Sequence, residues 1–235
     1  MPLPAATIVF DLDGTLVDTA PDLIGTLNAL FVREGLPPLD YEQARNLIGG
    51  GARRMIERGL CRDGAAVPPH ELDRLFRDFV AAYAARIAEL SRPFPGLERA
   101  LDRLSAAGCV FTICTNKLEW LSVRLMEELG LSSRFVAICG QDTFGVQKPD
   151  PEMVRRTVAR AGGRLERSVM IGDSRNDIEA AQAAGIPVVA VDFGYTEIPI
   201  GKLNPDRVIG HFDQLPEAVA SLIPGLAPVT GQPDG

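Results

Sequence analysis

The chain has 235 residues, 46% of them hydrophobic, which is enough to bury one large core or two smaller ones. Its net charge of -7 argues against a nucleic-acid-binding surface, and no apolar run reaches the roughly 18 residues of a membrane span. The first residues also lack the basic region of a signal peptide. We therefore predict a cytoplasmic protein with no nucleic-acid or membrane partner, in which the four cysteines are reduced.

The first predicted element is a buried strand over residues 7–10, which runs directly into Asp11-Leu12-Asp13-Gly14-Thr15. Residues i and i+2 of an extended chain share a face, so Asp11 and Asp13 are predicted to serve one site. Two carboxylates that close repel each other unless a cation or a shared proton holds them. The pair therefore suggests a metal site with separate roles for a nucleophile and for an acid/base.

The next segment, residues 19–92, is predicted to be helical and to contain no strand. Thr19-Ala20-Pro21-Asp22 has the spacing of a capping box, and a helix is expected from there to about Arg33. Further helices are predicted at 42–48, 52–60 and 71–90. Such a bundle, inserted after the first strand, is typical of a lid. We expect a catalytic core of residues 1–18 and 93–223, a helical cap of residues 19–92, and a flexible tail of residues 224–235.

From residue 93 onward, short apolar runs alternate with helical patterns. Runs without polar alternation are typical of a parallel sheet that helices cover on both faces. Strands are predicted at 110–114, 135–139, 169–171 and 188–191. Helices are predicted at 97–107, 118–129, 151–161 and 177–184. The alternation predicts an α/β fold with a doubly wound, Rossmann-like parallel sheet and the inserted α-helical cap domain.

Three more polar clusters follow predicted strands: Thr115-Asn116-Lys117, Lys148-Pro149, and Gly172-Asp173-Ser174-Arg175-Asn176-Asp177. Taken singly, each cluster is typical of a turn, a helix cap or a solvated lysine. In an open parallel sheet, however, ligands bind beyond the carboxyl ends of the strands. All four clusters are predicted to lie at that edge, which favours one shared site.

In type and order, the four clusters resemble the motifs of the haloacid dehalogenase-like hydrolase superfamily, and the resemblance covers nearly the whole chain. The first and fourth motifs are specific together, whereas Thr-Asn and Lys-Pro alone are weak. The resemblance implies that Asp11 attacks phosphorus to form an aspartyl phosphate. It implies that Asp13 protonates the leaving oxygen and later deprotonates water. An aspartate at this second position is the family's phosphatase pattern.

The resemblance also implies a Mg²⁺ cofactor, held by the carboxylates of Asp11 and Asp173 and the backbone carbonyl of Asp13. Asp177 has two open interpretations: a partner for water or lysine, or a charge that the helix dipole favours at a helix start.

The phosphoryl group has its own implied contacts. Thr115 and Asn116 would bind its oxygens at a helix start, through a hydroxyl and a backbone N–H. Lys148 would add positive charge and orient the nucleophile.

The cap run of residues 47–56 resembles that of bacterial phosphoglycolate phosphatases, and residues 193–195 and 204–209 resemble the late core strands of that group. This implies substrate contacts from Gly50 and Arg53, with Arg53 facing a carboxylate. The simpler alternatives are a connecting loop and a solvated arginine. The expected partner is a small phosphorylated metabolite, 2-phosphoglycolate, and the expected assembly is a monomer or a homodimer.

Other functions stay open at this stage. Phosphatases of sugar phosphates, nucleotides or pyrophosphate share every core motif. A phosphosugar mutase, a non-catalytic binding module and a regulator acting through the cap are further alternatives. Because all four motifs are intact, the sequence favours hydrolysis over the non-catalytic functions.

Overall fold

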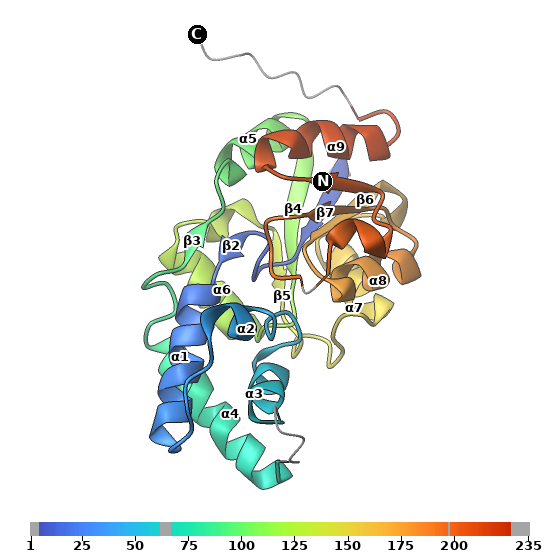
Figure 1. The fold of residues 1–235 in the computed structure, drawn as a ribbon. Helices are drawn as coiled ribbons and strands as arrows, with labels where there is room; N and C mark the ends of the chain where they lie inside the picture. Colours follow the sequence, from blue (N-terminus) through green and yellow to red (C-terminus); the bar gives the residue numbers. More distant parts are fainter. Residues whose placement is uncertain (1–4, 62–66, 197, 227–235) are drawn as a thin grey trace.

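A computed structural model describes residues 5–61, 67–196 and 198–226 of the chain (Figure 1). Its centre is a six-stranded sheet in the order β5-β4-β1-β6-β7-β8, in which every neighbouring pair is parallel. The strands are β1 (Ala6–Phe10), β4 (Cys109–Cys114), β5 (Ala137–Cys139), β6 (Ser168–Gly172), β7 (Val188–Val191) and β8 (Arg207–Ile209). The predicted doubly wound, Rossmann-like α/β core is confirmed.

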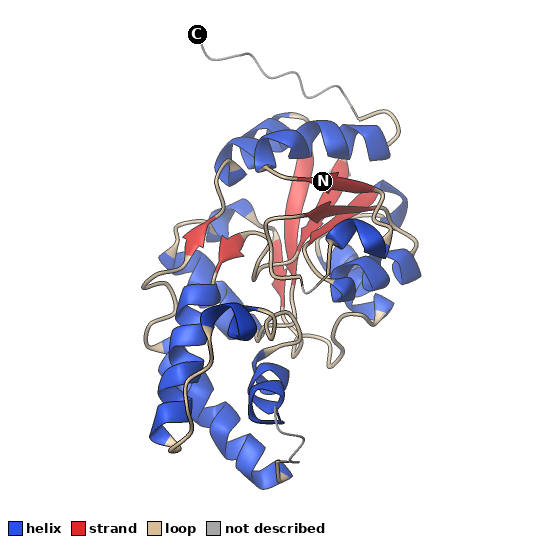
Figure 2. Cartoon of the chain, in the orientation of Figure 1, coloured by secondary structure: helices blue, strands red, loops and turns tan. Residues whose placement is uncertain are grey.

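Helices cover both faces of this sheet (Figure 2). They are α5 (Leu97–Ala106), α6 (Glu119–Glu128), α7 (Pro151–Arg160), α8 (Arg175–Ala184) and α9 (Leu215–Leu222). Successive side chains of β1 point to opposite faces, so Ile8 and Phe10 pack with α5, α6 and α9, while Val9 packs with α7 and α8. This double burial explains why the strands are apolar without alternation. The sequence analysis gave no prediction for α9.

The cap helices lie between two very short strands, β2 (Val17–Asp18) and β3 (Arg92–Pro93), which pair as an antiparallel ribbon (Figure 1). The ribbon carries the chain out of the core and back, and it lies at both predicted domain boundaries. The cap helices are α1 (Ala20–Arg33), α2 (Tyr41–Arg45), α3 (Ala52–Leu60) and α4 (Pro69–Ala84). The division into two domains stays a prediction, and most of the predicted tail, residues 227–235, lies outside the described residues.

Two predictions for the base of the cap are wrong. Thr19 and Asp22 form no capping box, because Thr19 Oγ1 donates to Asp13 Oδ1 at 2.8 Å instead. The buried Asp22 carboxylate accepts from the Leu90 amide, the Ser91 amide and the Ser91 hydroxyl. These bonds tie the returning chain to α1, and α4 ends at Ala84 rather than at residue 90.

Two further observations bear on the compositional predictions. Cys109, Cys114 and Cys139 are buried, Cys61 is partly exposed, and all four are free thiols. Among the helices in the described part of the chain, none combines the length and the apolar character that a bilayer crossing needs.

Candidate active site

The register of the sheet brings the four motifs to one edge. Phe10 of β1 pairs with Ile113 of β4 and with Ile171 of β6, so these three strands end at nearly the same level. The residues that follow them, Asp11, Thr115 and Asp173, therefore emerge together. The loop after β5 brings Lys148 to the same place, 2.8 Å from Asp11.

Three buried carboxylates form a compact cluster at this edge. Asp11, Asp173 and Asp177 each offer an oxygen within 4.8 Å of the others. The predicted pair Asp11 and Asp173 is thus brought together. Asp177 adds a third carboxylate, which the metal set predicted from the sequence did not include. Hard divalent cations such as Mg²⁺ prefer clustered carboxylate oxygens of this kind.

The charges of the cluster also fit a cation. Burial, as the largest cause, and the neighbouring charge of Asp177 together raise the pKa of Asp11 to about 7 and that of Asp173 to about 8. Lys148 Nζ lies 2.6 Å from Asp177 Oδ1 as well as beside Asp11, although its contact with Asp11 Oδ1 lacks hydrogen-bond geometry. One lysine cannot neutralise three carboxylates. The residues present therefore fit a divalent ion.

Asp173 is held from two sides. Its Oδ1 accepts from Thr15 Oγ1 at 2.8 Å, and its Oδ2 accepts from the amide of Tyr195 at 2.7 Å. The backbone of Gly14 passes so close that a Cβ there would lie 2.5 Å from Asp173 Oδ2, and its φ of +85° also disfavours other residues. Gly14 therefore permits the carboxylate to reach the cluster.

Asp177 satisfies both of the interpretations that the sequence left open. Its Oδ2 accepts from the amide and the hydroxyl of Ser174, at 3.0 and 2.6 Å, and so caps the start of α8. Its Oδ1 faces Lys148. One side chain thus begins the helix and anchors the lysine.

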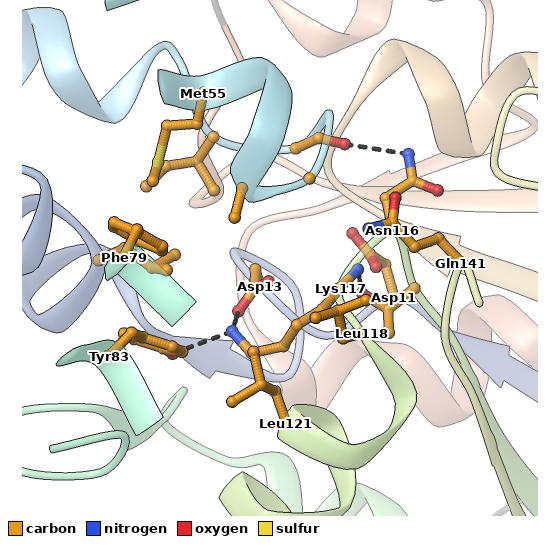
Figure 3. A pocket seen from close by; sticks show the side chains of 16 residues that line it. Asp11, Asp13, Met55, Phe79, Tyr83, Asn116, Lys117, Leu118, Leu121 and Gln141 are labelled. Carbon is orange, nitrogen blue, oxygen red and sulfur yellow. Dashed lines mark hydrogen bonds and ion pairs between the residues drawn. The ribbon is translucent and has the colours of Figure 1, made fainter. Parts of the chain in front are cut away.

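Asp13 is not part of the carboxylate cluster and has hydrogen-bond partners of its own. Its Oδ1 accepts from Thr19 Oγ1 and, at 2.9 Å, from Lys117 Nζ, which in turn lies 2.9 Å from the hydroxyl of Tyr83 in α4 (Figure 3). The sequence analysis gave Lys117 no role. A usable signal was present, because the chain has only three lysines among 24 basic residues.

Thr115 and Asn116 reach the site, but not at a helix start. Helix α6 begins only at Glu119, so the predicted placement is wrong. The Asn116 side chain instead bonds to the backbone of Lys148 at both its amide and its carbonyl, at 2.9 and 3.0 Å. The phosphoryl contacts of Thr115 and Asn116 stay a prediction.

The glycine loop of the cap touches the core through Gly49. Its carbonyl accepts from Asn116 Nδ2 at 3.3 Å and from Asn176 Nδ2 at 3.1 Å, so two core motifs hold the loop. Gly50 and Arg53 lie elsewhere: neither lines the cavity that Asp11 and Asp13 open into, and Arg53 forms an ion pair with Asp73. Their contact with substrate stays a prediction that this geometry does not favour.

A cavity lies between the cap and the core. At one end it exposes Asp11, Asp13 and Lys117, and the rest of its wall is largely apolar (Figure 3). The apolar wall comprises Leu23, Ile48, Ala52, Met55, Phe79, Leu118 and Leu121. One end of the cavity therefore offers two carboxylates and one cation, and residues of both the cap and the core form its walls.

Comparisons with known proteins identify the family of this chain. The haloacid dehalogenase-like hydrolase model matches residues 8–191. The chain belongs to this hydrolase family. Its relatives include a phosphoglycolate phosphatase of Caulobacter vibrioides, 46% identical over 97% of both chains. Another, of Mesorhizobium japonicum, is 48% identical over 88% of this chain and 92% of its own.

A solved structure extends the likeness to the fold of this family. It is described as a predicted phosphoglycolate phosphatase from Haemophilus somnus, and it is 28% identical with a TM-score of 0.83. The match covers 91% of this chain and 97% of that one. The resemblance stated from the sequence motifs, to the superfamily and to this branch of it, is therefore confirmed.

Proposed function

We propose that this hydrolase is a Mg²⁺-dependent phosphomonoester phosphatase that works through an aspartyl phosphate, and that its substrate is 2-phosphoglycolate. The observation that carries the proposal is the opening of Asp11 and Asp13 into one cavity beside the buried carboxylate cluster. The names of the relatives support the choice of substrate.

In the first half-reaction, a carboxylate oxygen of Asp11 attacks phosphorus. The bond between phosphorus and the ester oxygen breaks, and Asp13 gives its proton to that oxygen, so that glycolate leaves. Lys148, 2.8 Å from Asp11, orients the nucleophile and offsets the charge of the phosphoryl group. Asp11 and Asp13 both line the cavity in which the phosphoester would bind, and Lys148 contacts Asp11 from outside it.

In the second half-reaction, Asp13 takes a proton from water as the water oxygen attacks phosphorus. The bond from phosphorus to the Asp11 oxygen breaks, which releases phosphate and restores the carboxylate. Asp13 returns to its protonated form at the same time. Thr19 and Lys117 keep its Oδ1 fixed, so that the other oxygen is left for the proton transfers.

Asp11, Asp173 and Asp177 would hold the ion, with the Asp13 carbonyl as the further ligand that the sequence predicts. When bound, Mg²⁺ neutralises the phosphate charge that would otherwise repel an anionic nucleophile. The Thr15 and Tyr195 contacts fix Asp173 for that role. The use of divalent ions in this family agrees with the carboxylate cluster.

The walls of the cavity bear on the alternatives. Cap side chains such as Ile48, Met55 and Phe79 provide no hydrogen bonds for the hydroxyls of a sugar. A hydroxyl buried against these side chains without a partner costs about 1–3 kcal/mol, so a sugar would depend on the polar wall residues Tyr83, Thr115, Asn116 and Gln141, and a smaller substrate is favoured. Phosphatases of nucleotides or pyrophosphate remain alternatives. A cytoplasmic location and a monomeric or dimeric state stay predictions.

A substrate panel tests the proposal. We would measure kcat/KM with Mg²⁺ for 2-phosphoglycolate, glucose 6-phosphate, AMP and pyrophosphate, and expect the first to be highest. The Asp11→Asn variant is expected to lose turnover while its circular dichroism stays near that of the wild type. If glucose 6-phosphate or AMP exceeds 2-phosphoglycolate, the substrate is wrong; if Asp11→Asn stays active, the nucleophile is wrong.

A further inference from the structure

Lys117 is a buried cation that the proposed chemistry does not need for bond making. Of the three lysines in the chain, Lys117 and Lys148 are buried at this site, while Lys202 is exposed. Lys148 is committed to Asp11 and Asp177. Lys117, unlike Lys148, lines the cavity together with Asp11, Asp13 and the apolar side chains. Burying an ammonium is costly unless charged or polar groups compensate for the lost water, so its position calls for a function.

The surroundings of Lys117 leave one N–H donor of its ammonium for a ligand. An ammonium has three N–H donors. Among the described residues, Asp13 Oδ1 and the Tyr83 hydroxyl take two of them, each at 2.9 Å, and the Tyr83 ring centroid lies 4.4 Å from Nζ. Tyr83 thus fixes the ammonium from the cap side. The third donor is available to a molecule in the cavity that Lys117 lines.

The spacing between Asp13 and Lys117 matches a particular class of leaving group. Asp13 is proposed to serve the ester oxygen through Oδ2, while Lys117 Nζ donates to the other oxygen of the same carboxyl group, Oδ1, at 2.9 Å. A group that extends one carbon from the ester oxygen would therefore lie beside Lys117. In a phosphorylated 2-hydroxy acid, that group is a carboxylate.

No other cation competes for that carboxylate among the described residues that line the cavity. Arg53, the arginine that the sequence suggested for this task, lies outside the cavity in its ion pair with Asp73. The apolar walls lower the local dielectric, which strengthens the attraction between an ammonium and an enclosed carboxylate. A neutral group in the same position has no such charge–charge attraction to the ammonium.

We propose that Lys117 is a specificity-determining residue that binds a carboxylate one carbon from the ester oxygen, with Tyr83 holding its ammonium in position. The site then selects phosphoesters of short 2-hydroxy acids over neutral phosphoesters of the same size. This inference rests on the proposed function and deepens it.

The test compares 2-phosphoglycolate with 2-hydroxyethyl phosphate, which has the same two-carbon skeleton but ends in a hydroxyl. The readout is the ratio of the two kcat/KM values. In Lys117→Met this ratio is expected to fall at least about 30-fold, since losing one partner of a buried, hydrogen-bonded charge pair costs about 2–5 kcal/mol. Tyr83→Phe keeps the ring and is expected to lower the ratio several-fold. Lys202→Met, a matched change on the surface, is expected to leave it unchanged.

Two outcomes overturn the inference. If Lys117→Met lowers both kcat/KM values equally, Lys117 only positions Asp13. If the wild type hydrolyses both compounds equally well, the enzyme is a phosphatase but does not recognise the carboxylate. Failure of the proposed function gives a different result, because the wild type would then hydrolyse neither compound.

A second measurement guards against misfolding of Lys117→Met. Glycolate and inorganic phosphate are each tested as inhibitors of p-nitrophenyl phosphate hydrolysis by Tyr83→Phe and by the wild type. The inhibition constant of glycolate is expected to rise several-fold in the variant, while that of phosphate stays the same. An equal rise for both inhibitors contradicts the proposal.

Discussion

The guanidinium of Arg45, in the cap, lies over the ring of Tyr195, in the core, with 5.2 Å between Arg45 Cζ and the ring centroid. The same guanidinium donates to the carbonyls of Phe193 and Gly194, at 3.2 and 2.8 Å. Tyr195 in turn donates its amide to Asp173 and its hydroxyl to Asp18 of the ribbon. A single core tyrosine thus contacts the cap, the connecting ribbon and the carboxylate cluster.

Removing this cap contact is expected to weaken substrate binding. In Arg45→Ala, two charge-assisted hydrogen bonds to core carbonyls are lost, each worth about 1.5–3 kcal/mol at most. Because the reacting residues all belong to the core motifs, we expect KM to rise about 5- to 20-fold with a smaller change in kcat. Arg99→Ala, which breaks an exposed ion pair with Asp213, serves as the control and should leave KM unchanged. An unchanged KM in Arg45→Ala would show that this contact does not hold the cap.

The carboxylate cluster predicts how stability depends on pH and on metal. Burial raises the pKa of Asp11 to about 7 and that of Asp173 to about 8, from a value of 3.8. At a pH between the unfolded value of 3.8 and these raised pKa values, the folded state binds more protons than the unfolded state. The metal-free protein therefore loses stability as the pH rises from about 4 to about 8. Mg²⁺ replaces those protons. Its stabilising effect on Tm should therefore be larger at pH 8 than at pH 6.

Thermal unfolding with and without Mg²⁺ at the two pH values checks this expectation. Asp173→Asn provides the control, because it removes one titrating carboxylate and one metal ligand together. Its Tm should respond less to both pH and Mg²⁺. A Mg²⁺ shift that is equal at both pH values in the wild type would contradict the prediction.

Gly14 is expected to be essential for the position of Asp173. In Gly14→Ala, the new Cβ would lie 2.5 Å from Asp173 Oδ2, in a backbone with φ of +85°, so the carboxylate or the loop must move. We expect activity to fall about 100-fold, since a displacement of about 1 Å at a reacting group has that order of effect. Gly25→Ala is the matched control: nothing lies within 4 Å of its Cβ in α1, and the change should stabilise by about 0.5–1 kcal/mol. Near-normal kcat/KM and Mg²⁺ affinity in Gly14→Ala would refute the prediction.

Asp22 is expected to carry much of the stability of the cap base. Its buried carboxylate accepts hydrogen bonds from the Leu90 amide and from the buried amide and hydroxyl of Ser91, so Asp22→Ala removes the acceptor of all three donors. The expected loss is about 2–4 kcal/mol in the free energy of unfolding, measured by urea denaturation. Ser91→Ala removes only the hydroxyl bond and should cost about 1 kcal/mol. Equal losses in the two variants would argue against this role of the carboxylate.

The sequence by itself determined the core of this fold and its edge of polar motifs. Strands buried on both faces must be apolar throughout, and parallel strands must present the residues after them at one edge. That is why Asp11, Lys148 and Asp173 were predicted to meet, and why the cap was predicted from the helical patterns before residue 93. These features depend on local pattern and on general rules of topology, which a single sequence contains.

Only the tertiary structure decided which polar side chains serve which partner. Thr19 has the spacing of a capping residue, but it bonds to Asp13 because the ribbon brings them together. Arg53 seemed suited to a carboxylate, yet the fold turns it toward Asp73 and places Lys117 at the cavity instead. A hydrogen bond or an ion pair depends on distances of a few ångströms between residues far apart in the chain. Such distances follow from how the cap packs on the core, which no local pattern records.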